Sequence, residues 1–140
     1  MERSSGAAPP LSSGASGDPE GSQSLTVRVE PLGTSGCVVY MSGELDLSTI
    51  PRVEKQIFEQ VHRKEGVIVD LTGVSFIDSS GIALLIKAFR ATHDARALNT
   101  VIAEGSQVER VFRLAGIDRA LPLFTDRAPA VEALNGAAGD

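Results

Sequence analysis

The stretch Val74–Leu85, VSFIDSSGIALL, decides the fold, because an apolar segment changes within it into a helical pattern. From Ile82 onward, apolar residues recur at the i, i+3, i+4 and i+7 spacing of one helix face. These residues are Ile82, Leu85, Ile86 and Phe89. The spacing predicts a helix over about Ser80–Thr92, with its N-terminus at Asp78-Ser79-Ser80. An acid and two serines therefore stand at a helix entrance.

A helix and a buried strand are predicted before this stretch. Residues 67–71, VIVDL, are nearly all apolar, as in a strand that is covered on both faces. The helix before them carries an apolar stripe. Its members are Ile50, Val53, Ile57 and Val61. We expect Ser48 or Thr49 to cap this helix and Gly66 to end it. A strand that follows a helix in this way favours parallel pairing.

A hairpin is predicted at the start of the folded region. Residues 25–30, LTVRVE, alternate between apolar and polar, which is the period of a half-buried strand. Pro31–Gly36 supplies turn residues, and Cys37–Ser42 forms the second strand. Gly43–Asp46 is then expected to be a loop.

Two further pairs of strand and helix complete the chain. Thr100–Ala103 is predicted as a strand, and Ser106–Glu109 is a capping box that opens a helix ended by Gly116. Leu121–Phe124 is predicted as a short strand, and a last helix is expected over about residues 126–136, with an acid at its start as cap.

The element order ββαβαβαβα predicts a single α/β domain over residues 25–135, with a mixed sheet and about four α-helices. Residues 1–24 are mostly Ser, Gly, Ala and Pro. They hold too little apolar surface to offset the entropy of ordering them, which predicts a disordered leader. Residues 136–140 are expected to fray.

Composition excludes two classes of partner. The formal net charge is −5 and the pI is near 5.0, so the surface is expected to repel nucleic acid and anionic membranes. Cys37 is the only cysteine, which excludes an intramolecular disulfide and favours a reducing, cytoplasmic environment. No apolar stretch approaches the length of a membrane span, and the N-terminus lacks the apolar region of a signal peptide.

Three short segments stand at characteristic places among these elements. They are GELD at 43–46, LTGVSFIDSSG at 71–81 and VERVFRLAGI at 108–117. Together and in this order they resemble the STAS family, and within it the anti-sigma factor antagonists. The resemblance covers about Leu25–Leu134 and implies a STAS-type mixed sheet and a regulator that is not an enzyme.

The resemblance also implies a switch. In that family, the serine directly after the motif's aspartate is phosphorylated by a kinase that is itself the anti-sigma factor. Only the unphosphorylated protein binds this kinase and so frees the sigma factor. Here the phosphoacceptor would be Ser79. The partner-binding surface would comprise Asp46, Asp78, Ser79, Ser80 and Gly81, with no cofactor and no metal.

The physics of a helix N-terminus agrees with a phosphate at Ser79. Unpaired N–H groups and the positive end of the helix dipole favour an anion there, so modification should act on the partner and not on the fold. Two other interpretations remain. In one, Ser79 and Ser80 only cap the helix and have no regulatory role. The domain is alternatively a STAS scaffold or sensory module without a phosphorylation switch.

Enzyme chemistry finds little support in the sequence. The nucleophile turn of a serine hydrolase needs a glycine where Ile77 stands, and the two histidines, His62 and His93, fall on helices without an evident orienting partner. Asp70 ends a buried strand, as the phosphoacceptor of a receiver domain does. The acidic pair that would hold Mg²⁺ is missing, because Glu30 stands alone.

Overall fold

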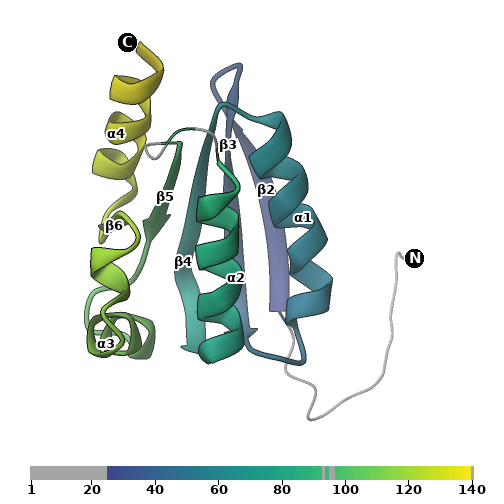
Figure 1. The fold of residues 1–140 in the computed structure, drawn as a ribbon, viewed down its shortest axis with the longest axis vertical. Helices are drawn as coiled ribbons and strands as arrows, with labels where there is room; N and C mark the ends of the chain where they lie inside the picture. Colours follow the sequence, from purple (N-terminus) through teal and green to yellow (C-terminus); the bar gives the residue numbers. More distant parts are fainter. Residues whose placement is uncertain (1–24, 93, 95–96, 140) are drawn as a thin grey trace.

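A five-stranded mixed sheet lies at the centre of the molecule, in the order β2-β3-β4-β5-β6 (Figure 1). This computed structural model describes residues 25–92, 94 and 97–139. The predicted leader, residues 1–24, lies outside the described residues. The element order is ββαβαβαβα with a short 3₁₀ helix added, which confirms the predicted α/β class.

The first two strands form the predicted antiparallel hairpin, β2 (Leu25–Leu32) and β3 (Gly36–Leu45). The second strand is longer than expected, because residues 43–45 were predicted as a loop and instead continue β3. They pair with the end of β4, and Leu45 is fully buried in the core. Gly43 has φ +119°, a conformation that favours glycine.

Helix α1 (Ile50–Arg63) buries the predicted stripe against the sheet. The prediction for its start is correct in position only, and the prediction for its end is wrong. Thr49 occupies the N-cap position, but its hydroxyl donates to the carbonyl oxygen of Glu44, at 2.8 Å, and makes no cap bond. The helix ends before Gly66, because Lys64 already has extended backbone, and Gly66 is the first residue of β4.

Strand β4 (Gly66–Ile77) is central and parallel to β3 and β5. It runs six residues past the predicted end at Leu71, and its pairing with β3 shifts between Tyr40 and Ser42 and again between Gly43 and Glu44. At both shifts β4 holds one residue more than β3, which is the pattern of a β-bulge. The irregular part of β4 thus leads directly into α2 (Ser79–Arg90).

The remaining elements are β5, α3, the 3₁₀ helix η1, β6 and α4. Their bounds are Leu98–Val101, Gln107–Leu114, Ile117–Arg119, Leu123–Phe124 and Arg127–Gly139. Strand β5 thus begins two residues before the predicted start, β6 is shorter than predicted, and α4 continues past residue 136. The capping prediction at Ser106 is confirmed, since its hydroxyl accepts from the amide of Glu109 at 3.1 Å.

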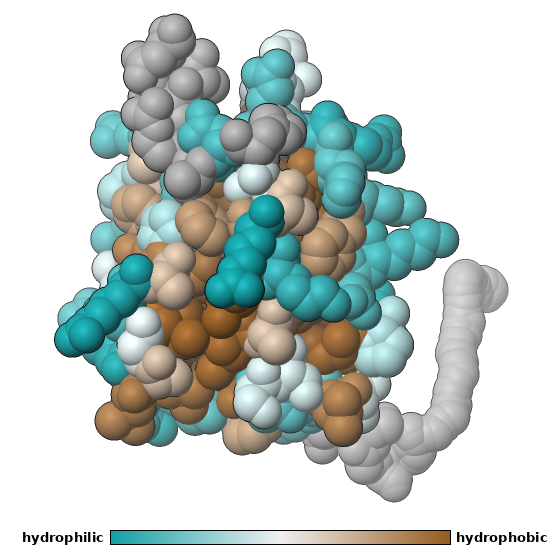
Figure 2. Space-filling view, viewed as in Figure 1, coloured by the Kyte–Doolittle hydropathy of each residue, from teal (hydrophilic) through white to brown (hydrophobic). Residues whose placement is uncertain are grey.

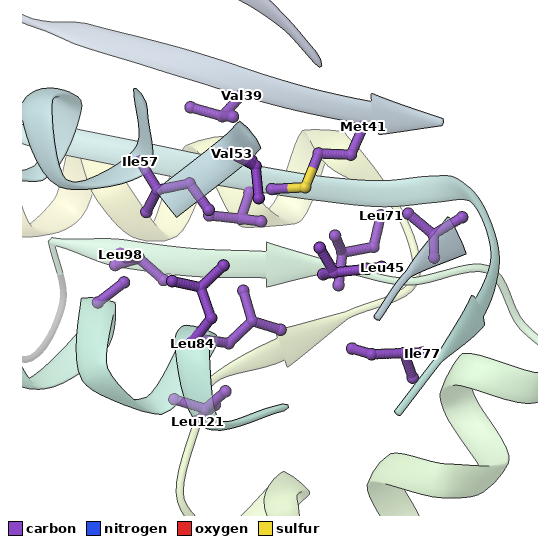
Figure 3. Packing of buried hydrophobic residues seen from close by; sticks show 14 of the residues in the cluster. Val39, Met41, Leu45, Val53, Ile57, Leu71, Ile77, Leu84, Leu98 and Leu121 are labelled. Carbon is purple, nitrogen blue, oxygen red and sulfur yellow. The ribbon is translucent and has the colours of Figure 1, made fainter. Parts of the chain in front are cut away.

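Two apolar clusters hold the sheet, one on each face. Helices α1, α2 and α3 pack on the larger cluster, part of which appears in Figure 3. Neighbouring β4 residues point to opposite faces, so Val67 and Val69 join this cluster, whereas Ile68 joins the smaller one under α4. Cys37 is buried in the larger cluster.

An ion pair also fixes α4 to the sheet. Arg127 donates to Oδ2 of Asp70 at 2.6 Å and also contacts Glu30 at 3.3 Å. Thr72 donates to the other oxygen, Oδ1, through its hydroxyl and its amide, at 2.7 and 2.9 Å. The buried Asp70 carboxylate is therefore satisfied by structural partners.

Candidate functional site

The site lies where β3 and β4 end and α2 begins. Asp78 is the N-cap of α2, and its Oδ1 accepts hydrogen bonds from the amides of Ser80, at 2.9 Å, and Gly81, at 3.2 Å. The interpretation that Ser79 or Ser80 caps this helix is therefore wrong. A carboxylate performs that role, and it also suits the positive end of the helix dipole.

The same carboxylate joins α2 to the segment between β3 and α1. The amide of Leu47 donates to Oδ2 of Asp78 at 3.2 Å. Asp46, one residue earlier, accepts at Oδ1 from the amide and hydroxyl of Ser48, at 3.0 and 2.7 Å, and from the amide of Thr49 at 3.2 Å. These bonds, the Ser48 hydroxyl first, lower the pKa of Asp46. One hydrogen-bonded network thus connects the two predicted site acids, Asp46 in the turn and Asp78 at the start of α2.

Ser79 is the first residue of α2 and is exposed. No hydrogen bond among the described residues involves its hydroxyl. Ser80 is less exposed and follows one position further into the helix, so its side chain points in another direction. Of the two predicted serines, Ser79 offers the more accessible hydroxyl.

Gly81 lies beneath this surface. It is buried, and a Cβ at this position would stand 2.7 Å from Cγ1 of Ile77 and 2.9 Å from the carbonyl oxygen of Leu45. The first turn of α2 therefore rests directly on the ends of both strands. Gly81 serves the site by permitting this close approach.

Gln107, at the start of α3, holds the end of β4 from another side. Its Oε1 accepts from the amide of Ile77 at 3.0 Å, and its Nε2 donates to the carbonyl oxygen of the same residue at 3.2 Å. The backbone just before Asp78 is thus fixed by a side chain thirty residues away in the chain. Sequence reasoning missed Gln107, because nothing in its local pattern indicates a contact over that distance.

Within the described part of the chain, no histidine is hydrogen-bonded to the Ser79 hydroxyl. His62 lies on α1, with its Nδ1 3.0 Å from the carbonyl oxygen of Phe58 in the preceding turn. His93 lies outside the described residues. Among those that the structure describes, no group of three His, Cys, Asp or Glu side chains could hold a metal ion.

The comparison with protein families decides the identity of the fold. The STAS domain model matches residues 27–130, from β2 into the start of α4. The chain belongs to the STAS domain family. In this chain, Asp78 and Ser79 lie at the junction of β4 and α2 within the matched region.

No helix of the described residues is long and apolar enough to cross a membrane.

Three proteins illustrate the relationship. The anti-sigma-B factor antagonist of Listeria monocytogenes is 26% identical over 95 residues, which cover 66% of this chain and 82% of that protein. The anti-sigma-F factor antagonist RsfB of Mycobacterium tuberculosis is 29% identical over 100 residues, covering 71% and 81%.

A solved anti-sigma factor antagonist from Mycobacterium paratuberculosis superimposes with a TM-score of 0.74 at 27% identity, covering 80% of this chain and 95% of that chain. All three relatives are named as regulators and none as an enzyme. This STAS protein therefore stands among non-enzymatic members, as the sequence predicted.

Proposed function

We propose that this STAS protein is an anti-sigma factor antagonist that phosphorylation of Ser79 switches off. In its unphosphorylated form it binds an anti-sigma factor of the serine-kinase type, and a sigma factor is released. The observation that carries the proposal is the Ser79 hydroxyl at the N-terminus of α2, which is exposed and has no hydrogen-bond partner among the described residues. The names of the relatives supply the class of partner.

The local geometry supports a switch that leaves the fold intact. Asp78 already caps α2, so the hydroxyl of Ser79 is not needed to hold the helix. A phosphate on Ser79 would add about 1.5 to 2 negative charges at a helix N-terminus, where an anion is tolerated. The modification should therefore change the surface and not the core.

The partner would respond to that change of charge. A surface fitted to a neutral hydroxyl loses affinity when a dianion must be buried in it, and a mismatched charge in an interface typically costs about 2 to 5 kcal/mol. We place Asp46, Asp78, Ser79 and Ser80 at the partner surface. Gly81 lies beneath it as the support of the first helical turn.

Phosphate transfer tests the proposal. The purified chain is mixed with ATP and, in turn, with each anti-sigma kinase of its own genome, and its mass is followed. We expect one kinase to add a single phosphate, which peptide mapping should place on Ser79. Ser79→Ala should abolish the transfer, and the matched control Ser80→Ala should retain it.

Two outcomes would count against the proposal. Phosphate on Ser80 or in residues 1–24 would overturn the assignment of Ser79. If no kinase modified or bound the chain, the scaffold interpretation would replace the switch.

A further inference from the structure

A second feature of the site is apolar. Leu47 is 73% exposed, although the backbone around it is fixed on both sides. Its amide is bonded to Asp78, and the residues on either side are held through the Asp46 carboxylate. An ordered turn therefore presents a large aliphatic side chain to solvent, directly beside the predicted partner acids.

The α2 surface next to Ser79 is apolar as well. Residues three, four and seven positions after Ser79 share its side of the helix. They are Ile82, Ala83 and Ile86, of which Ala83 is exposed and the other two are partly so. Figure 2 shows hydrophobic side chains gathered over α2 and toward the lower end of this view, where α2 begins. We call Leu47, Ile82, Ala83 and Ile86 the apolar surface.

The charge near the N-terminal end of α2 has one sign, whereas Lys87, which follows Ile86 and is paired with Glu54 at 3.3 Å, lies at the other end of the apolar surface. Residues 41–51, 72–86 and 97–109, which contain the ends of β3, β4 and β5, include no Lys or Arg. They include five acids, which are Glu44, Asp46, Asp78, Glu104 and Glu109. A partner that fits this end of the molecule therefore needs basic side chains around an apolar centre.

We propose that Leu47 is the apolar anchor of the partner surface and enters an apolar recess of the anti-sigma factor, whose basic rim faces Asp46 and Asp78. This inference rests on the proposed function, because it concerns the same partner and the same surface. Exposed aliphatic side chains beside a recognition site are typical of interaction surfaces.

The anchor also explains why a phosphate would be costly. Contact through Leu47 and α2 excludes water from the neighbouring Ser79. The segments around Ser79 supply no cation of this chain to a buried phosphate. A neutral hydroxyl tolerates this dry, apolar contact, whereas a dianion does not.

The test compares four full-length chains, wild type and three variants, for affinity to the anti-sigma kinase identified by phosphate transfer. Leu47→Ser should weaken binding about tenfold or more, as truncating an interface anchor does. Leu47→Met keeps the apolar volume and should bind within about threefold of wild type. Leu114→Ser is the matched control, because Leu114 is 88% exposed at the end of α3, outside the apolar surface, and should change nothing.

Each result decides between the proposals. If wild type binds and Leu47→Ser binds equally well, the anchor is refuted and the proposed function stands. Equal losses for Leu47→Ser and Leu114→Ser would also refute the anchor, because the effect would not be local. If wild type binds no anti-sigma kinase, the proposed function itself fails and the anchor with it. Unchanged melting temperatures would exclude damage to the fold.

Discussion

At the scale of single residues, the site depends on the two oxygens of one carboxylate. Asp78 caps α2 with Oδ1 and holds the amide of Leu47 with Oδ2. The neighbouring Ser79 is exposed, and its hydroxyl makes no hydrogen bond among the described residues. Replacing Ser79 by alanine should therefore leave the helix in place, because the cap comes from another residue.

Asp78→Ala should lower the free energy of unfolding by about 0.5 to 2 kcal/mol, because two amides of α2 lose their acceptor. Asp78→Asn is the matched control, since asparagine is an equally good N-cap but has only one acceptor oxygen. We expect asparagine to restore most of the stability. Urea unfolding measures both, and an alanine variant as stable as wild type would show that Asp78 does not cap the helix.

Gly81→Ala should also destabilise the protein, although alanine is intrinsically the better helix former. The added Cβ would meet the carbonyl oxygen of Leu45 at 2.9 Å, and this backbone atom cannot swing away as a side chain can. Crowding of this kind typically costs about 1 to 3 kcal/mol. Thermal unfolding should show a lower midpoint than for Ser80→Ala, and a stabilised Gly81→Ala would contradict the close packing of α2.

At the scale of elements, contacts between distant segments position the site. The bulged end of β4 delivers Asp78, α3 fixes that end through Gln107, and α4 is held on the opposite face through Arg127 and Asp70. Each contact joins parts of the chain that no local pattern connects. The position of the site therefore depends on the contacts that α2, α3 and α4 make with β4.

The Asp70 pair should appear in the pH dependence of stability. Burial acts to raise the pKa of Asp70, but hydrogen bonds from Thr72 and Arg127 outweigh it and hold the pKa below its usual value. A carboxylate whose pKa is lower in the folded state stabilises the fold at pH values above its unfolded pKa, about 3.9. This stabilisation is lost as the pH falls below that value.

The free energy of unfolding of Asp70→Asn should therefore change less between about pH 4 and pH 2 than that of wild type. This range lies below the unfolded pKa of the carboxyl group. Wild type should fall more steeply over the same range. Urea titrations at several pH values provide the measurement. Parallel curves for the two proteins would mean that the carboxylate is not stabilised by its partners.

At the scale of the whole molecule, local patterns predicted the architecture but not the contacts. Hydrophobic periodicity predicted the element order and the buried stripe of α1, because those follow from spacing along one segment. The stripe predicted for α2 was only partly right, because Leu85 is buried but Ile82, Ile86 and Phe89 are only partly so. Periodicity missed the continuation of β3 through Gly43 and of β4 to Ile77, since both depend on pairing between strands. The alternative interpretation, in which Ser79 and Ser80 only cap α2, was wrong, because Asp78 is the N-cap.

For the site as well, local motifs predicted some residues, whereas residues defined by long-range contacts were missed. The motif at residues 71–81 indicated Asp78 and Ser79, and the structure places them together with Asp46 through the amide of Leu47. Neither Gln107 nor the exposed Leu47 was predicted. Their roles depend on where α3 and the turn after β3 lie in space, which the sequence pattern does not encode.

The affinity of the anti-sigma kinase for this chain, measured by calorimetry before and after phosphorylation, tests the central claim most directly. The phosphorylated sample is first verified by peptide mapping of Ser79. We predict that the unphosphorylated chain binds at least about tenfold more tightly, and that Ser79→Ala behaves like it. Equal affinities, or tighter binding of the phosphorylated chain, would contradict the switch.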